Sequence, residues 1–152
     1  MLHRARGFYE LASSSDGTMR QEEAAMVSFA FATELALKAM NDRPAHGHDL
    51  SRLFTALPEA TQQTLADEYM QVRGGYLPDD LASCRNIFIE LRYYHEKSGY
   101  AAPFGKLRFL AKFLIEAGDK AVRDRPDREF FSLEEHFPGG LKLPGPNVSR
   151  HD

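Results

Sequence analysis

The sequence predicts an all-α protein, an up-and-down bundle of four to five helices, and three observations lead to this fold class. Several long stretches place apolar residues at every third or fourth position, which is the helical period. No stretch alternates apolar and polar residues for long enough to predict a strand. Polar clusters, glycines and prolines separate the helical stretches. With 152 residues, 43% of them hydrophobic, the chain suits one domain with its own core.

The first two helices are expected at Leu2–Ala12 and Thr18–Met40. The apolar positions of the first are Leu2, Phe8, Tyr9, Leu11 and Ala12. Thr18 and Gln21 have the spacing of a capping box for the second. The polar residues between Ala24 and Met40 are Ser28, Thr33, Glu34 and Lys38. Because these are so few, we expect the second helix to be central and covered on several sides, with Glu34 and Lys38 paired one turn apart.

A loop at residues 41–47 leads to a short helix, Leu50–Ala56, capped by Asp49 or His48. Its apolar face comprises Leu50, Leu53, Phe54 and Leu57. His46, His48 and Asp49 have metal-binding side chains, but further histidine or cysteine partners at zinc spacing are missing from the sequence. We therefore expect a cap here and no metal site.

Pro58 is expected to open the next helix at its first position. This helix should run to Val72, with Leu65, Tyr69 and Val72 facing inward. Residues 73–78 then form a loop, and the absence of a Lys-Ser or Lys-Thr pair after its two glycines argues against a phosphate-binding loop.

The stretch Asp79–Ser98 is expected to form one helix, begun by Asp79 and Asp80 and ended at Ser98-Gly99. At 100° per residue its broad apolar face comprises Cys84, Ile87, Phe88, Leu91 and Tyr94. A narrower stripe carries Arg85, Ile89, Arg92 and Glu96.

The narrower stripe is the predicted functional site. Arg85 and Arg92 would lie roughly 10 Å apart on one line, with His95 at the border of the apolar face. Guanidinium groups suit phosphate and an imidazole can move protons, so these three residues are the predicted catalytic or phosphate-binding groups. Asn86, Glu96 and Lys38 complete the predicted ligand-binding set.

Each of these residues also has a structural interpretation. Arg92 and Glu96 can form a surface pair worth only about 0.2 to 0.5 kcal/mol. Arg85 can cover the edge of the core with its methylene groups, and His95 can be a half-buried core residue.

The last helix is expected at Lys106–Asp124, packed through Leu107, Leu110, Ala111, Leu114 and Ile115. Beyond it, the apolar residues of the segment 125–137 are Phe130, Phe131, Leu133 and Phe137. We predict that this segment docks on the helical domain, which thus spans residues 1–137, and that residues 138–152 form a mobile tail.

Charge and cysteine content narrow the class of protein. A net charge of −3 argues against strong non-specific binding to nucleic acid, although residues 85–128 carry ten Lys/Arg against six Asp/Glu. That local excess predicts a binding surface or, alternatively, side chains that complement helix dipoles. A single cysteine, no leader sequence and no apolar run of about 20 residues predict a cytoplasmic protein without a membrane span.

Three pieces of the chain resemble the HEPN family, whose name records nucleotide binding in higher eukaryotes and prokaryotes. They are SFAFATELALKAM, GHDLSRLFTALP and RNIFIELRYYHE, within residues 20–97. The more distinctive positions are Glu34, Lys38, Ala39, the step His48-Asp49-Leu50, and Arg92-Tyr93. The family is made of helical bundles, in agreement with the predicted fold class.

The resemblance implies a homodimer with a cleft between equivalent helices of two protomers. Many family members are metal-independent endoribonucleases of toxin–antitoxin or phage-defence systems, often encoded beside a small nucleotidyltransferase antitoxin. Their signature is an arginine, commonly followed by a polar residue, with a histidine after four to six intervening residues. Arg85-Asn86 matches its start, whereas Glu90 stands at the first histidine position and His95 is the first histidine after Arg85.

From the residues and the resemblance together we predict a HEPN-like dimeric module that contacts RNA or a nucleotide phosphate through Arg85, Arg92 and His95. No metal or other cofactor is expected. One alternative is an active metal-independent endoribonuclease toxin that uses the same residues. Another is a non-catalytic dimerisation module in which Arg92 and Glu96 belong to the interface.

Overall fold

The computed structural model describes residues 1–14, 19–42, 44–85, 87–88 and 104–123, and within these ranges it has helices and no strand. The helices are α1 (Leu2–Ser13), α2 (Met19–Met40), α3 (Leu50–Thr55), α4 (Glu59–Arg73), α5 (Leu77–Cys84) and α7 (Phe104–Arg123). The all-α prediction is confirmed. The described part holds six such helices, against four to five given for the bundle, and each falls on one of the six stretches expected to be helical; two of the six are short.

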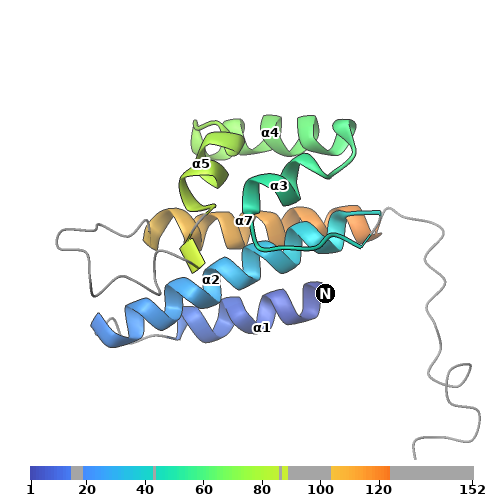
Figure 1. Cartoon of the computed structure of the whole chain (residues 1–152). Helices are drawn as coiled ribbons and strands as arrows, with labels where there is room; N and C mark the ends of the chain where they lie inside the picture. Colours follow the sequence, from blue (N-terminus) through green and yellow to red (C-terminus); the bar gives the residue numbers. More distant parts are fainter. Residues whose placement is uncertain (15–18, 43, 86, 89–103, 124–152) are drawn as a thin grey trace, which may run out of the picture.

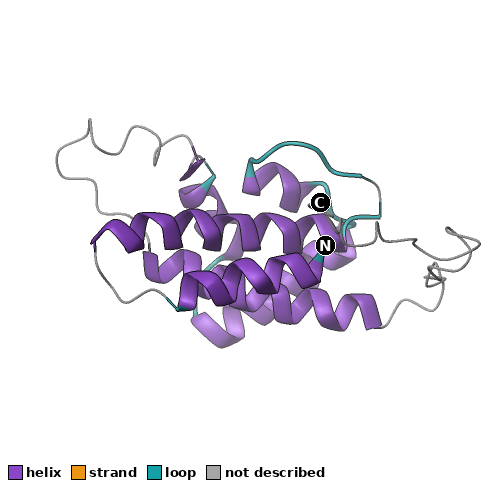
Figure 2. Ribbon diagram, turned by 90° about the horizontal axis from the view of Figure 1, so that it is seen from below, coloured by secondary structure: helices purple, strands orange, loops and turns teal. Residues whose placement is uncertain are grey.

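Helix α2 occupies the centre of the bundle, as expected from its few polar residues. It packs against α1, α3 and α7. Figure 1 shows α1 running antiparallel to α2, and α7 running in the same direction as α2. Helices α3, α4 and α5 lie together on one side of this group, and Figure 2 gives the view from below with α1 in front. Helix α2, which has few polar residues between Ala24 and Met40, is therefore covered on several sides, as expected.

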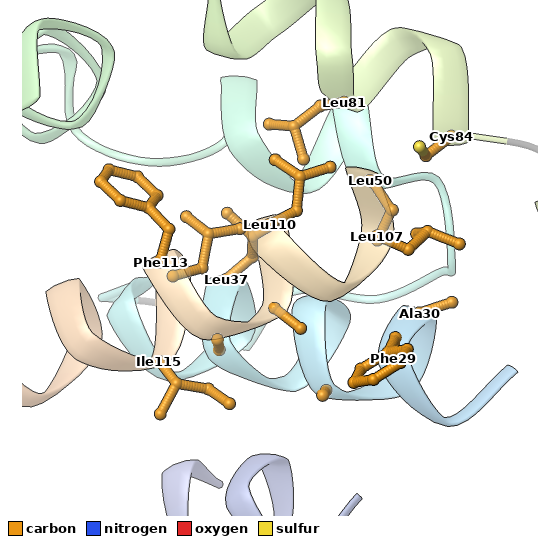
Figure 3. Close-up of a cluster of buried hydrophobic side chains, with 14 of the residues drawn as sticks. Phe29, Ala30, Leu37, Leu50, Leu81, Cys84, Leu107, Leu110, Phe113 and Ile115 are labelled. Carbon is orange, nitrogen blue, oxygen red and sulfur yellow. The ribbon is translucent and has the colours of Figure 1, made fainter. Parts of the chain in front are cut away.

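The core lies between α2, α7 and the short helices. Figure 3 shows Phe29 and Leu37 of α2 facing the α7 side chains, with Leu81 and Cys84 of α5 on the opposite side of α7. The α7 leucines of this cluster are Leu107, Leu110 and Leu114, each 0% exposed. Burying a side chain of this size contributes about 1.5 to 3 kcal/mol, so the predicted apolar face of the last helix anchors the bundle.

Local signals in the sequence set the ends of several helices. The Asp49 carboxylate accepts a hydrogen bond from the Arg52 amide at 3.1 Å, so Asp49, and not His48, caps α3. Pro58 precedes α4 as its N-cap, one residue earlier than expected. Gly74 ends α4 with a φ of 71°, a left-handed conformation that glycine adopts without strain.

Two apolar residues expected inside are instead exposed. Leu11 is 64% exposed and Val72 is 63% exposed. In α1 the buried residues are Ala5 and Ala12, and Leu11 points about 100° away from Ala12 around the helix. Val72 lies in the last turn of α4, beyond the part that Leu65 and Tyr69 bury. Leu11 thus lies beside the buried face of its helix, and Val72 lies beyond the end of the buried face of α4.

The prediction of a single helix over Asp79–Ser98 is wrong in two respects: the helix starts earlier, and it ends within the predicted stretch. Helix α5 begins at Leu77 with Tyr76 as its N-cap, so Asp79 and Asp80 lie in its first turn and do not cap it. It ends at Cys84, and Arg85 is its C-cap. Ile87 and Phe88 are again helical, but the two arginines can no longer be placed on one continuous helix that starts at Asp79.

Helix α5 is held by ionic contacts that local sequence does not show. The Asp80 carboxylate accepts hydrogen bonds from Tyr69 Oη at 2.5 Å and Lys106 Nζ at 2.7 Å. Arg73 Nε lies 3.5 Å from the same carboxylate. Burial raises the pKa of Asp80, but the hydrogen bonds from Lys106 and Tyr69 and the charges of Lys106 and Arg73 outweigh it, so the pKa lies below its usual range. This carboxylate joins α4, α5 and α7.

Other expectations fall outside the described residues. They concern the Thr18 cap, residues Leu91 and Tyr94, the segment 125–137 and the tail 138–152. Among the helices that the structure does describe, none is long and apolar enough to span a bilayer.

Candidate functional site

The structure describes two of the predicted site residues. Arg85 is exposed at the C-terminal end of α5, and Lys38 lies in the last turn of α2. Asn86, Arg92, His95 and Glu96 lie outside the described residues. Of the predicted set, the described ranges therefore place Lys38 and Arg85, and the candidate site is built from Lys38 and its neighbours.

Lys38 belongs to an ionic cluster centred on Glu34. Glu34 lies one turn earlier in α2 and is 4% exposed. Lys38 Nζ donates to Glu34 Oε1 at 2.7 Å, which confirms the expected pair. The second carboxylate oxygen, Oε2, lies 2.9 Å from Nδ1 of His48. One buried carboxylate thus binds two basic side chains, one from its own helix and one from the loop before α3.

The burial of Glu34 explains why both oxygens are occupied. A carboxylate removed from water costs several kcal/mol unless charged or hydrogen-bonding partners replace the water. Lys38 is itself mostly covered, with 16% of its side chain exposed, and it satisfies one oxygen. His48 satisfies the other. Because an ionised carboxylate only accepts hydrogen bonds, Nδ1 carries the hydrogen in this contact, and Nε2 is the imidazole's second reactive atom.

His48 is fixed at one edge and open to solvent elsewhere. Its side chain is 67% exposed although its Nδ1 contacts a buried oxygen. Its ring lies edge-on to the Phe88 ring, with centroids 5.6 Å apart. The Phe88 ring in turn packs on the Phe31 ring of α2, with centroids 4.7 Å apart. The Phe31 ring packs on the Phe8 ring of α1, with centroids 5.4 Å apart. This row of rings places His48 against the chain segment that follows Arg85.

Lys38 also lines an open hollow. It measures about 500 Å³, which is within the range of small-ligand sites. The polar residues that line it are His3, Lys38, Asn41 and Asp42. Asn41 also joins the end of α2 to α3, because its Nδ2 donates to the carbonyl oxygens of Leu37 and Leu53, both at 3.3 Å. Lys38 therefore contributes to both the hollow and the Glu34–His48 contact.

Sequence reasoning treated His48 as a cap or metal ligand and missed its contact with Glu34. The available signal was Glu34 itself, since a carboxylate in an apolar helix has two oxygens to satisfy and Lys38 reaches one. The 14-residue separation of Glu34 and His48 hides the second partner from local patterns. Among the described residues there is no group of three or more potential metal ligands.

Comparison with protein-family models, with curated proteins and with solved structures finds no match to this chain.

Proposed function

We propose that this chain is a HEPN-like helical module that binds a phosphate-bearing ligand, RNA or a nucleotide, at the surface around His48. The observation that carries the proposal is the exposed imidazole of His48, which the buried carboxylate of Glu34 holds through Nδ1. A positioned imidazole beside a lysine is a suitable partner for a phosphate oxygen.

The charges of the cluster support this proposal. Lys38 brings a positively charged side chain to the same carboxylate that holds the imidazole of His48. Arg85 adds an exposed guanidinium three residues before Phe88, whose ring contacts His48. The proposed site would be completed by Arg92, His95, Asn86 and Glu96.

The resemblance to the HEPN family supports a dimeric form of the same proposal. In that form two protomers face each other, and each contributes its basic side chains to a shared cleft. The proposed setting is a toxin–antitoxin or phage-defence system with a nucleotidyltransferase-type antitoxin as partner.

The second candidate function is a metal-independent endoribonuclease, and the contact between Glu34 and His48 favours it. A carboxylate that fixes Nδ1 leaves Nε2 to accept a proton from a 2′-hydroxyl or to donate one to the leaving oxygen. Such proton transfer contributes typically about 10² to 10⁴-fold to a rate. In this candidate Arg85, Arg92 and His95 would supply the remaining charge and the second proton-transfer group.

Binding and cleavage of a fluorescent single-stranded RNA, measured in EDTA, test both candidates. Fluorescence anisotropy gives the dissociation constant, and gel analysis of the same samples gives the cleavage rate. The informative variants are His48→Ala, Arg85→Ala and His48→Asn, because asparagine can keep a donor near the Nδ1 position but has no counterpart of Nε2. The matched controls are His46→Ala, an exposed histidine of the same loop, and Lys112→Ala, an exposed cation of α7.

For the binding function we expect His48→Ala and Arg85→Ala each to weaken RNA binding at least about fivefold, which corresponds to roughly 1 kcal/mol. The two controls should change it less than twofold. Cleavage that disappears in His48→Asn while binding remains supports the endoribonuclease. If the native chain binds neither RNA nor ATP but forms a stable dimer, the dimerisation module is the correct function.

A further inference from the structure

A groove between α4 and α7 lies apart from the His48 surface. It consists of two hollows of about 360 and 300 Å³, and Glu68, Ala117 and Lys120 line both. Lys120 Nζ lies 3.4 Å from Glu68 Oε2, and both side chains are partly exposed, so this ion pair crosses the groove between the hollows. The groove follows α7 from Phe109 to Ala121, which is about 18 Å at 1.5 Å per residue.

Apolar side chains form much of the groove. Phe109 and Phe113 lie edge-on to the Tyr69 ring, with centroids 5.7 and 5.1 Å away. Val72 lines the larger hollow together with Phe109 and Phe113. It is 63% exposed, although it continues the helical spacing of the buried residues Leu65 and Tyr69 in α4. Val72, Phe109 and Phe113 therefore form an apolar part of the groove that is available to another apolar segment.

The chain itself continues from one end of this groove. Ala121 lines the second hollow, and α7 ends two residues later at Arg123. Residues 124–152 follow and lie outside the described ranges. Within them, residues 129–137 read EFFSLEEHF and hold four large apolar side chains, of which Phe130, Leu133 and Phe137 have the i, i+3, i+7 spacing of one helical face.

We propose that residues 129–137 dock in the groove between α4 and α7 of their own chain, with Phe130, Leu133 and Phe137 against Val72 and Phe113. The connection 124–128 has the required reach, since five residues span up to about 16 Å and Pro126 favours a change of direction after α7. This inference does not depend on the phosphate site.

The groove carries charges of both signs. Its lining holds Lys112 and Lys120, with side chains 62% and 60% exposed, and also Glu68 and Glu116. The segment carries Glu129, Glu134 and Glu135, for which the two lysines are the available partners. Lys112 lies 4.0 Å from Glu116 on the same helix, a distance at the outer limit of an ion pair, so it keeps donors for an incoming carboxylate.

Covalent attachment favours the chain's own segment over a second molecule. A short tether gives an effective concentration in the millimolar range, far above the micromolar concentration of a typical sample. The segment can therefore occupy the groove even when its intrinsic affinity is low.

Thermal unfolding of the full chain tests the proposal through a double-mutant cycle. The groove variant is Val72→Glu, which is exposed enough to leave the fold intact, and the segment variant is Leu133→Ser/Phe137→Ser. The matched controls are Met70→Glu, exposed on α4 but lining neither hollow, and Leu141→Ser/Leu143→Ser beyond the segment. Each measurement is made at three protein concentrations spanning a hundredfold range.

We expect the groove and segment variants each to lower Tm by roughly 3 to 5 °C, and their combination to lower it no further. The controls should shift Tm by less than about 1 °C, and the result should not depend on concentration. Additive or absent effects, or an equal effect of Met70→Glu, would overturn the proposal. A non-additive effect that grows with concentration, together with a dimer in light scattering, would instead assign the groove to a second copy.

Discussion

The Glu34 carboxylate binds His48 Nδ1 at 2.9 Å across fourteen residues of chain, and this contact fixes the loop before α3 to the central helix. Glu34 is 4% exposed, whereas the His48 side chain is 67% exposed. The contact therefore joins the interior of the bundle to its surface, and removing either partner has a different consequence.

Glu34→Gln is expected to destabilise the fold, because it leaves the mostly covered Lys38 without its counter-charge. The free energy of unfolding should fall by about 1 to 3 kcal/mol in urea titrations. Glu23→Gln, an exposed change in the same helix, is the control and should alter it by less than about 0.5 kcal/mol. Adding Lys38→Met to Glu34→Gln should recover part of the loss, and a further loss would contradict the assigned pairing.

Asp80 predicts a specific dependence of stability on pH. Its pKa in the folded chain lies below the ordinary aspartate value of 3.8. Between the two values the unfolded chain binds more protons than the folded chain, so stability rises with pH in that window. The stabilisation is present above about pH 4 and is lost as the pH falls through the folded pKa.

Asp80→Asn should remove this acid-dependent stabilisation. We expect it to lower the urea midpoint at about pH 7 by an amount equivalent to roughly 1 to 2 kcal/mol, and we expect this difference from the unmodified chain to shrink as the pH falls through the folded pKa of Asp80. The control is Asp79→Asn, a change to an exposed neighbour in the same helical turn. Equal pH profiles for the two variants would show that Asp80 is not the responsible carboxyl group.

Asp49→Ala should weaken the N-terminus of α3. The Arg52 amide would lose its side-chain acceptor, at a cost of about 1 kcal/mol in unfolding free energy. Asp49→Ser should restore most of the loss, because serine also caps helices. If alanine and serine are equivalent in chemical denaturation, the cap does not contribute as proposed.

Gly118 of α7 lies against Leu2 of α1. A methyl group at this position would lie 2.8 Å from Cδ2 of Leu2. Gly118→Ala should change stability little, because the helix-propensity gain of about 1 kcal/mol offsets displacement of a flexible side chain. Gly118→Val should cost about 1 to 3 kcal/mol in unfolding free energy, and Leu2→Ala should partly relieve that cost.

Gly105 provides the comparison within the same helix. A methyl group at Gly105 meets no described atom within 4 Å, so Gly105→Ala should raise the free energy of unfolding by about 0.4 to 1 kcal/mol. Calorimetric melting of these variants distinguishes crowding from helix propensity. If alanine at position 118 raises the free energy of unfolding as much as alanine at position 105, Leu2 does not crowd position 118.

Local sequence signals predicted the parts of the fold that depend on local chemistry. The apolar run that ends at Met40 predicted a central helix, and Asp49 was correctly proposed as a cap. The end of α5 at Cys84 could not be predicted this way, because residues 79–98 contain neither glycine nor proline. The contacts of Asp80 with Tyr69, Arg73 and Lys106 hold α5 in place, and these partners come from α4 and α7.

The candidate site shows the same limit. Lys38 was predicted from its spacing to Glu34, since both lie on one helix. His48 reaches Glu34 only after the loop and α3 have folded against α2, so no periodic pattern could assign it this contact. Arg85 was named from the sequence and is exposed, but its predicted alignment with Arg92 assumed a helix that ends one residue before Arg85.

Cys84 gives the bundle a built-in chemical probe. It is the single cysteine of the sequence and is 1% exposed, packed where α5 meets α7. Because the sulfur is buried, a thiol reagent reaches it when the structure around Cys84 opens. The rate of labelling under native conditions therefore measures how often this part of the bundle opens, without any engineered residue.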